Sequence, residues 1–431
     1  MCIFLKNHAS NIAFAIFYQK QNIYSFNALL GALETNKDLD DIEIKFYQKK
    51  DELIDGIQKL PSTYKKIIIG ISFFTTQLWE IIELVKKLRK IIDKKIILIA
   101  GGAHPSGDPE GTLRIGFDAV VIGEGEETLI DLLCHIKTDK VISSIKGIAY
   151  LGQNGEIIKT GKRALLDLDR YPPLPRKNIR FGAIEITRGC PYVCYFCQTP
   201  FILGTSPRHR SVSSICETIE YMKSKGKTDI RFITPNAFSY GSNDGYQLNL
   251  PKLEELLMKA SDILKPNGRI FLGSFPSEVR PEHVIPETIE LVKTYASNDN
   301  LIIGAQSGSQ NILDYCHRGH TIEDVIEAVD LTINSGLIAN VDFIFGLPGE
   351  NENDIDLTIE LIEILSKKGA KIHAHSFIPL PNTPFAKQEV KPINSRLKRV
   401  IKALNEKGIA YGDWLKQEYL AVKISRYLRS I

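Results

Sequence analysis

The chain has 431 residues, of which 43% are hydrophobic and 24% are charged, and its formal net charge is +3. This length predicts two or three domains, each large enough for a core of its own. A charge so near zero gives no electrostatic reason to expect a nucleic-acid or membrane-surface partner. The opening apolar segment, Ile12–Phe17, is too short to cross a bilayer and follows no secretory signal pattern.

Short apolar runs alternate with helical patterns in the first third of the chain. The runs are rich in Ile, Val and Phe, which predicts buried strands, and apolar residues between them recur at helical spacing. These strand–helix units predict a doubly wound parallel sheet over residues 1–140, with ligands bound at the carboxyl ends of its strands. The predicted strands are Ile12–Phe17, Ile42–Phe46, Ile67–Ser72, Ile96–Ala100 and Ala119–Ile122.

Two of these strand ends are distinctive. The third strand runs into Gly70–Thr76, and the fourth runs into Ala100–Pro105 with its paired Gly101 and Gly102. A glycine pair lets a bulky ligand lie against bare backbone, although both segments could also be plain tight turns. A nicotinamide cofactor is disfavoured because Gly123–Glu126 lacks the third glycine of the dinucleotide motif and follows the fifth strand.

Residues 141–180 are predicted to form a hairpin and a linker. Gly147–Tyr150 and Glu156–Lys159 flank an Asn-Gly turn, and the proline-rich Asp167–Arg180 is expected to be stiff. Beyond the linker, six further apolar strands predict a partial (β/α)6 barrel over residues 181–385, with its chemistry at the strands' C-terminal ends. Residues 386–431 are expected to be a helical extension. The predicted barrel strands are Ala183–Thr187, Asp229–Ile233, Ile270–Ser274, Leu301–Ala305, Asn340–Phe345 and Lys371–Ile378.

The segment Thr187–Cys197 contains the strongest chemical signal. Cys190, Cys194 and Cys197 are spaced Cys-x3-Cys-x2-Cys, so three thiolates can converge from one loop onto one inorganic centre. Three thiolates on a four-iron cluster leave one iron open to a substrate or cofactor. The alternatives are three unconnected thiols or a zinc site without its fourth ligand, and the next histidine, His209, has no zinc-knuckle spacing.

The remaining cysteines are scattered and predict no disulfide framework, which indicates a reducing cytoplasm. An exposed cluster would further favour an anaerobic organism. These cysteines are Cys2, Cys134, Cys216 and Cys316, the last of which is expected to be a packed thiol.

The cysteine loop, including the aromatic Phe196 before its third cysteine, resembles the cluster loop of the radical S-adenosylmethionine (SAM) superfamily. The resemblance implies that SAM chelates the fourth iron of a 4Fe-4S cluster and that its reductive cleavage gives a 5′-deoxyadenosyl radical. It further implies that Phe196 packs near adenine and that residues at the strand ends hold SAM. One of them, Gln306, stands where the family more usually has glutamate. The implied SAM residues are Phe196, Asn236, Ser274, Gln306, Ser307, Ile344 and Gly346.

The N-terminal pattern resembles the cobalamin-binding domain. Ser72-x-Phe74 is followed, after a separation similar to that in the family, by the Gly101-Gly102 pair. A Gly-Glu-Gly-Glu segment like Gly123–Glu126, followed by an amphipathic helix, is usual where this domain precedes a radical SAM domain. The family's Asp-x-His-x-x-Gly motif is absent near Ser25–Leu30, which excludes the usual histidine ligand to cobalt but not cobalamin. Residues implied to bind cobalamin are Ser72, Phe74, Thr75, Gly101, Gly102, Gly123 and Glu124, and candidates for the lower cobalt face are Tyr18, Asn22, Tyr24 and Asn27.

Other polar residues have less specific expected roles. Arg208, Arg210 and Arg280 are candidates to pair with the SAM carboxylate or with an anionic substrate. His373 and His375 alternate along a strand and should therefore face one side, where an interior role is conceivable beside a purely structural one. No residue is assigned as a catalytic acid or base.

Both resemblances together imply a cobalamin-dependent (class B) radical SAM methyltransferase of the small archaeal type, which methylates an unactivated carbon. Tyr24–Phe26 and Phe232–Asn236 resemble archaeal members, which suggests a methanogen enzyme acting on a glutamine of methyl-coenzyme M reductase. The expected partners are a peptide, protein or small-molecule methyl acceptor and an electron donor such as ferredoxin or flavodoxin, with no nucleic acid and no membrane. The alternatives are a cyclase or rearrangement enzyme, a methylthiotransferase, which would be expected to carry more N-terminal cysteines, and a non-catalytic cobalamin sensor.

Overall fold

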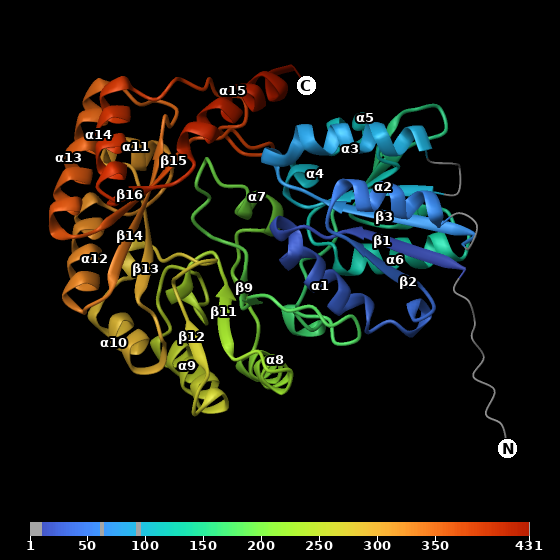
Figure 1. Cartoon of the computed structure of the whole chain (residues 1–431), viewed down its shortest axis with the longest axis horizontal. Helices are drawn as coiled ribbons and strands as arrows, with labels where there is room; N and C mark the ends of the chain where they lie inside the picture. The colour runs from blue at the N-terminus through green and yellow to red at the C-terminus, as the bar shows by residue number, and fades with distance from the viewer. Residues whose placement is uncertain (1–10, 61–63, 92–95, 431) are drawn as a thin grey trace. The chain divides into compact units, whose positions relative to one another are not determined.

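The computed structural model describes residues 11–60, 64–91 and 96–430, and it splits into two compact units (Figure 1). The first unit comprises the residues up to Leu166 together with Arg170–Gly182. The second comprises Asp167–Asp169 and the residues from Ala183 onward. Cys2 lies outside the described residues.

The first unit is built on a sheet whose strands β1 to β5 run parallel. All of β1 is buried, and so is β3 apart from its first residue, because helices cover both faces of the sheet. In spatial order the strands are β2 (Glu43–Tyr47), β1 (Ile12–Phe17), β3 (Lys66–Ser72), β4 (Ile96–Gly101), β5 (Ala119–Val121), β6 (Ile148–Leu151) and β7 (Ile157–Lys159).

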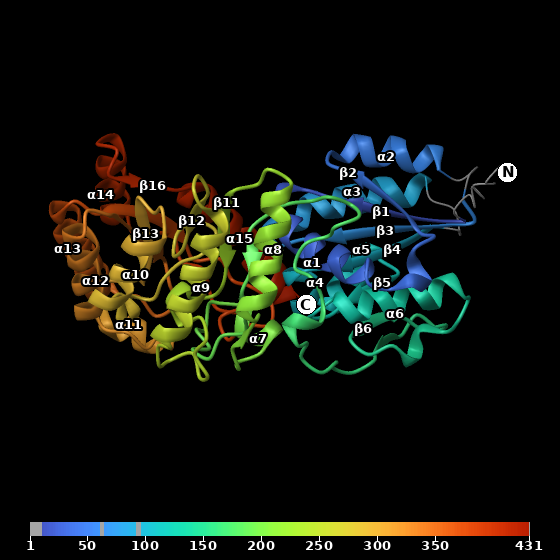
Figure 2. The same ribbon diagram turned by 90° about the horizontal axis from the view of Figure 1, so that it is seen from below.

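Helices α2 (Lys50–Lys59) and α3 (Leu78–Ile91) lie on one face of this sheet, and α1 (Ile23–Leu33) and α6 (Glu126–Lys137) lie on the other (Figure 2). The short helices α4 (Ala103–Gly107) and α5 (Pro109–Ile115) follow β4. Because β2 and β3 flank β1, the strand order reverses at β1, and open α/β sheets bind ligands at such a switch point. The predicted doubly wound domain is confirmed.

The predicted hairpin forms, but it belongs to the first sheet and is not part of a separate linker. Strand β6 pairs antiparallel with β5 in the register Ala119↔Tyr150, and β7 extends the sheet by one strand. The hairpin turns at Gly155, whose φ of +80° suits glycine. Pairing of this kind satisfies the free edge of β5, which an isolated hairpin would leave exposed.

The second unit contains a sheet in the order β12-β11-β8 and a sheet in the order β13-β14-β15-β16, with all neighbours parallel. A parallel bridge between Val279 and Ile303 connects the first sheet's end to β13. These strands form the predicted partial barrel. They are β8 (Ile184–Glu185), β11 (Asp229–Ile233), β12 (Arg269–Phe271), β13 (Asn300–Gln306), β14 (Ile338–Phe345), β15 (Lys371–Ser376) and β16 (Ala410–Tyr411), beside a short antiparallel pair, β9 (Thr187–Arg188) and β10 (Arg208–His209).

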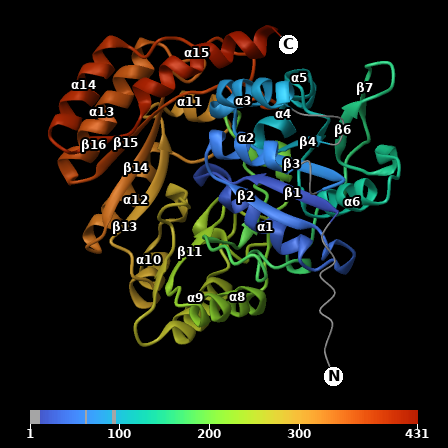
Figure 3. The same cartoon turned by 45° about the vertical axis from the view of Figure 1, so that its right-hand side comes forward.

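Helices α12, α13 and α14 line the outer side of β13, β14 and β15 (Figure 3). Alternate residues of β14 are buried on that side, which leaves Asn340, Asp342 and Ile344 on the interior side of the barrel. The helices of this unit are α7 (Thr199–Leu203), α8 (Val212–Ser224), α9 (Leu250–Leu264), α10 (Pro286–Tyr295), α11 (Gln310–Tyr315), α12 (Ile322–Asn334), α13 (Glu352–Lys368), α14 (Ser395–Glu406) and α15 (Trp414–Ser430).

Two expected boundaries in this unit differ from the structure. Strand β12 ends at Phe271 instead of Ser274, because Gly273 has a φ of +67° that breaks the extended backbone. The C-terminal extension is not wholly helical, because Ala410–Tyr411 adds an edge strand to β15 between α14 and α15. Within the described residues no helix is both long enough and apolar enough to span a membrane.

Candidate active site

The three cysteines of the motif lie in the loop between β9 and α7, with Cys194 buried and Cys190 and Cys197 half-buried. Among the described residues, the only three His, Cys, Asp or Glu side chains with ligand atoms all within 4.8 Å of one another are a different group, so the three sulfurs are spread more widely. Thiolates on one zinc ion, with Zn–S bonds of about 2.3 Å, would lie about 3.8 Å apart. The three sulfurs are therefore not arranged as a ready-made site for a single zinc ion.

A cation accompanies these thiols. The Arg318 guanidinium places Nη1 3.7 Å from Cys194 Sγ, while its Nη2 donates to the carbonyl of Gly304 at 2.9 Å. Burial raises the pKa of Cys190 and raises that of Cys197 to about 11. A buried positive charge beside the loop counters this desolvation penalty and favours an anionic sulfur-bound centre.

Backbone hydrogen bonds hold the loop in place. The Cys190 N–H donates to the carbonyl of Gly204 at 3.1 Å, and the Tyr195 N–H donates to that of Cys316 at 3.0 Å. Val193 adopts a φ of +53°, a conformation that non-glycine residues rarely take without a surrounding structure that imposes it. The loop is therefore positioned by contacts that do not involve its thiols.

An apolar patch adjoins this loop. Phe196 and Ile344, both implied to lie near adenine, are partly buried and pack against the same buried cluster. Gly346 lies two residues beyond Ile344, has a φ of +74°, and donates its N–H to Glu350 Oε2 at 3.0 Å. The cluster consists of Ile312, Cys316, Leu347, Phe377 and Phe385, and Cys316 is a packed thiol in it, as expected.

Gln306 occupies an unusual position at the end of β13. It has a φ of +71° beside a register shift between Gly304 and Gln306, and it is 5% exposed. A Cβ on Gly304 would lie 2.6 Å from Arg318 Nη2 and 2.7 Å from Gln306 Nε2, so glycine is needed for both side chains to pass. Glu278 approaches the same point, and burial raises the pKa of its carboxyl.

The other strand-end residues are engaged within the protein. Asn236 donates through Nδ2 to His283 Nδ1 at 2.6 Å and accepts the Arg280 N–H at 3.2 Å. Ser307 Oγ accepts the N–H of Ser309 at 3.2 Å. Ser274 Oγ accepts a hydrogen bond of 3.3 Å from Arg231. These bonds fix the strand ends, and direct contacts with SAM remain a prediction.

The arginines proposed to meet an anion also have partners in the protein. Arg208 donates to the carbonyl of Leu203 at 2.8 Å, and Arg210 donates to that of Glu185 at 3.2 Å. The Arg280 guanidinium stacks over the ring of Tyr192, with Cζ 3.3 Å from its centroid. Each of these arginines supports the loop and strand ends around the cysteines.

In the first unit, the end of β3 meets the glycine pair that follows β4. Gly102 has a φ of +95°, and a Cβ there would lie 2.6 Å from Ser72 Oγ and 3.0 Å from the backbone nitrogen of Phe73. Gly101 is unstrained, with Val121 Cβ as the nearest atom at 3.9 Å. Gly102 thus packs closely against the end of β3, and a side chain at residue 102 would not fit without a shift of that strand end.

The residues after Ser72 differ sharply in exposure. Phe74 is 44% exposed, which is unusual for a large aromatic ring, whereas Thr75 is buried. Thr75 Oγ1 lies 3.1 Å from His104 Nδ1, and the His104 ring packs on Phe73 with centroids 5.3 Å apart. His104 is fully buried, so its contacts with Thr75 and Phe73 help to fix the segment that follows β3.

Two further groups of predicted cobalamin residues lie near this edge. The Gly123 N–H donates to Ser106 Oγ at 3.0 Å, and Glu124 accepts the N–H of Leu166 at 2.7 Å. Tyr18 donates to Asn27 Oδ1 at 2.7 Å at the end of β1. Among the other lower-face candidates, Tyr24 lies beside Gly182, and Asn22 donates to the carbonyls of both Phe17 and Ser72 at 3.0 Å, so it ties β1 to β3.

Comparison with known families identifies both units. Residues 25–133 match the B12 binding domain, and residues 184–362 match the radical SAM superfamily. The chain combines a B12 binding domain with a radical SAM domain. Its cofactors are therefore a 4Fe-4S cluster, SAM and cobalamin, as the sequence predicted.

Curated relatives share about a quarter to a third of their aligned residues with the chain. An uncharacterized methyltransferase of Pyrococcus horikoshii is 25% identical over 75% of this chain and 70% of its own length. A putative methylthiotransferase of Methanocaldococcus jannaschii is 31% identical over 66% of this chain and 60% of its own length. A tRNA-2-methylthio-N(6)-dimethylallyladenosine synthase of Petrotoga mobilis is 32% identical over 64% of this chain and 62% of its own length. The chain thus spans less than two thirds of the latter two relatives.

Two solved structures share the fold of this B12-binding radical SAM protein. The radical SAM methyltransferase TsrM of Kitasatospora setae, with cobalamin and a 4Fe-4S cluster, superimposes with a TM-score of 0.66 at 16% identity, covering 88% of this chain and 74% of TsrM. The cobalamin-dependent SAM radical enzyme OxsB superimposes with a TM-score of 0.63 at 18% identity, and the match covers 83% of this chain and 52% of OxsB.

The structure of each unit suits its cofactors. In the B12-binding domain, Gly102 lets the backbone after β4 approach the end of β3 at the sheet's carboxyl edge, and Phe74 at that edge is exposed. In the radical SAM domain, three free cysteines share one loop, and Arg318 supplies positive charge beside Cys194. Arg318 gave no signal in the sequence beyond its place before a helix.

We expect a pH dependence in the B12-binding domain. Burial lowers the pKa of His104 from 6.5 to about 4. Between pH 6.5 and pH 4 this histidine is therefore protonated in the unfolded chain and neutral in the folded chain. Stability should therefore fall as the pH drops from 6.5 towards 4, by about 3 kcal/mol in full. Hydrogen exchange of β4 and α4, corrected for intrinsic rates, should accelerate across this window in the wild type but much less in His104→Gln. Equal acceleration in both proteins would contradict the assignment.

Proposed function

We propose that this protein is a cobalamin-dependent radical SAM methyltransferase that transfers a methyl group to an unactivated carbon. The observation that carries the proposal is that one chain combines a B12 binding domain with a radical SAM domain that contains the three-cysteine loop. When bound, the cluster and SAM supply hydrogen abstraction and cobalamin supplies the methyl group, which the protein orients and shields from water.

The chain's own residues divide these tasks. Cys190, Cys194 and Cys197 hold the cluster, and Arg318 balances its charge. Phe196, Ile344 and Gly346 receive the adenine against the apolar cluster, which excludes water from the reacting groups. The SAM methionine and ribose groups are assigned to Asn236, Ser274, Gln306 and Ser307, and the cobalamin tail to Ser72, Thr75, Gly101, Gly102, Gly123 and Glu124, with Phe74 beside the ring.

The methyl acceptor is proposed to be a peptide, protein or small molecule, and the electron donor a ferredoxin or flavodoxin. A glutamine of methyl-coenzyme M reductase is the specific acceptor proposed. Relatives from Pyrococcus and Methanocaldococcus support an archaeal setting without identifying an acceptor.

Methylthio transfer is the second candidate, because two of the relatives described above carry methylthiotransferase names. A second cluster would need further thiolates, and the chain has only Cys2 and Cys134 before its cluster loop. The cysteine count therefore favours methyl transfer.

Incubation of the anaerobically reconstituted protein with deuterated-methyl SAM, a reductant and candidate peptides distinguishes these functions. We expect 5′-deoxyadenosine together with a product that carries one labelled methyl group, read by mass spectrometry. A product heavier by a methylthio group would indicate the second candidate, and an isomerised product without label would indicate a cyclase or rearrangement enzyme. No 5′-deoxyadenosine with any acceptor or without one would indicate a cobalamin sensor.

A further inference from the structure

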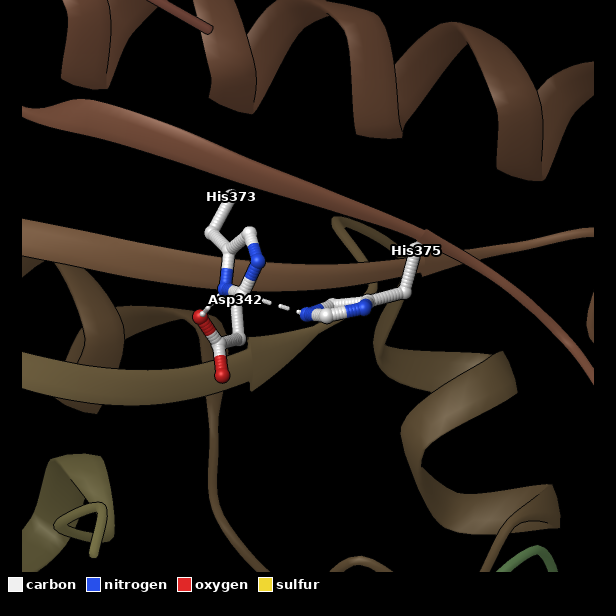
Figure 4. Close-up of side chains that lie close together, drawn as sticks. All are labelled: Asp342, His373 and His375. Carbon is white, nitrogen blue, oxygen red and sulfur yellow. Dashed lines mark hydrogen bonds and ion pairs between the residues drawn. The ribbon is translucent and has the colours of Figure 1, made fainter. Parts of the chain in front are cut away.

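Three ligand-type side chains converge inside the barrel, on strands away from the cysteine loop. Asp342 lies on β14 and pairs directly with His373 on β15, and His375 lies two residues further along β15 on the same face. Figure 4 shows the carboxylate and the two rings turned toward one another. His373 Nδ1 lies 2.9 Å from Asp342 Oδ1 and 3.1 Å from His375 Nε2.

Hydrogen bonds alone cannot fully satisfy the three polar atoms that converge here, His373 Nδ1, His375 Nε2 and Asp342 Oδ1. An imidazole nitrogen carries either one proton or one lone pair, so His373 Nδ1 cannot donate to Asp342 and accept from His375 at once. If it donates to the carboxylate, its single proton is engaged there, and His375 Nε2 can receive at most a weak, shared part of that bond. If it accepts from His375, its lone pair faces a carboxylate oxygen. A cation at the point of convergence satisfies all three atoms together.

The distances suit a transition-metal ion. Ligand bonds of about 2.1 Å at right angles place neighbouring ligand atoms about 3.0 Å apart, close to the two separations observed here. Two histidines and one carboxylate with open positions form a recurrent site for iron(II), and the same ligand types bind zinc. Asp342 and both histidines are only partly buried, so the site can be reached from the barrel interior.

Neighbouring residues hold the rings in position. Tyr411 on β16 stacks on His373 with centroids 4.4 Å apart and an interplanar angle of 10°. Gln417 accepts the Ser376 N–H at 2.8 Å and places Nε2 3.4 Å from His375 Nδ1, a contact too long to fix that ring's tautomer. Because the ligands stand on paired strands and not on loops, their spacing is set by the sheet register.

We propose that Asp342, His373 and His375 bind a divalent first-row transition-metal ion, distinct from the iron–sulfur cluster. Two protein nitrogens and one oxygen leave coordination positions open toward the barrel interior. An oxygen or nitrogen of a molecule in the barrel would complete the coordination. The binding of the ion does not depend on the proposed methyl transfer.

Zinc is the probe of choice, because neither the cluster nor cobalamin contains it. The anaerobically reconstituted holoprotein is equilibrated with zinc sulfate and desalted, and its zinc is measured by mass spectrometry. We expect about one zinc per chain and, in the X-ray absorption at the zinc edge, nitrogen and oxygen neighbours at about 2.0–2.1 Å. His373→Ala and Asp342→Asn should weaken zinc binding by more than the roughly 10- to 100-fold that follows loss of an outer-shell partner.

His135→Ala is the matched control, because this half-buried histidine lies on α6 of the other unit and contacts only backbone and Ser144 among the hydrogen bonds of the described residues. It should retain the zinc, and the acid-labile sulfide of the cluster and the circular dichroism should be unchanged in every variant. Sulfur neighbours at about 2.3 Å would show zinc in the cysteine loop and overturn the proposal. A wild-type protein that binds no zinc would also overturn it and would leave a proton-sharing triad, a result that needs no variant to fold.

Discussion

Replacement of Cys194 by alanine should abolish reductive SAM cleavage and deplete the cluster. Two thiolates cannot hold a four-iron cluster with one open iron, and the loss should exceed the roughly 10- to 100-fold cost of removing an outer-shell partner. Cys194 is the buried thiol of the three and the one beside Arg318, so no solvent-facing group can replace it. Iron content and 5′-deoxyadenosine yield measure the effect.

Cys216→Ala provides the control, because Cys216 is a half-buried thiol on α8 of the same unit and outside the loop. It should keep the iron and the cleavage activity. Wild-type values of both in Cys194→Ala would refute the cluster assignment.

The second large effect is expected from Gly102→Val, which should eliminate cobalamin binding. A valine there must adopt a φ of +95°, at a cost of roughly 1–2 kcal/mol, and its Cβ would press on Ser72 Oγ and the Phe73 backbone. The branched side chain would then displace the end of β3, where cobalamin is proposed to bind. The corrinoid absorption spectrum after anaerobic purification with cobalamin reports the loss, while iron content should remain that of the wild type.

Gly155→Val separates backbone strain from obstruction. Gly155 has a similar φ of +80° at the β6–β7 turn, but a Cβ there meets no atom within 4 Å. This variant should lose some thermal stability and keep its corrinoid. Loss of the corrinoid from both variants, or from neither, would show that the space at residue 102 does not decide binding.

Strand positions were largely predictable because burial on both faces produces continuous apolar runs. The predicted Ile12–Phe17 coincides with β1, every residue of which is buried. The predictions of strands and domain boundaries were wrong where a distant pairing partner decides whether a segment joins a sheet. The hairpin joins the first sheet through Ala119 and Tyr150, and Ala410 becomes a strand only because Ile372 lies beside it. No local pattern encodes such partners.

The candidate site residues likewise fall into those that a local sequence pattern indicates and those that depend on distant contacts. The cysteines, Phe196 and Gly102 could be proposed because short motifs carry them, and Ile344 because of its place at a strand end; their contacts with the cofactors stay predictions. Arg318 was not recognised as a neighbour of Cys194, since 124 residues separate the two in the chain. Asp342 was missed although it interrupts an apolar strand, because its significance depends on its register with His373.

The cysteine loop has a consequence for how the protein matures. Its shape is secured by the bonds from Cys190 to Gly204 and from Tyr195 to Cys316, and by the Gln198 amide, which donates to the carbonyl of Pro381 at 2.8 Å. None of these bonds uses a thiol. Small zinc domains, in contrast, fold only when the metal arrives. The radical SAM domain should therefore fold before its cluster is inserted. Cluster insertion would then be a late step of maturation that can be controlled separately from folding.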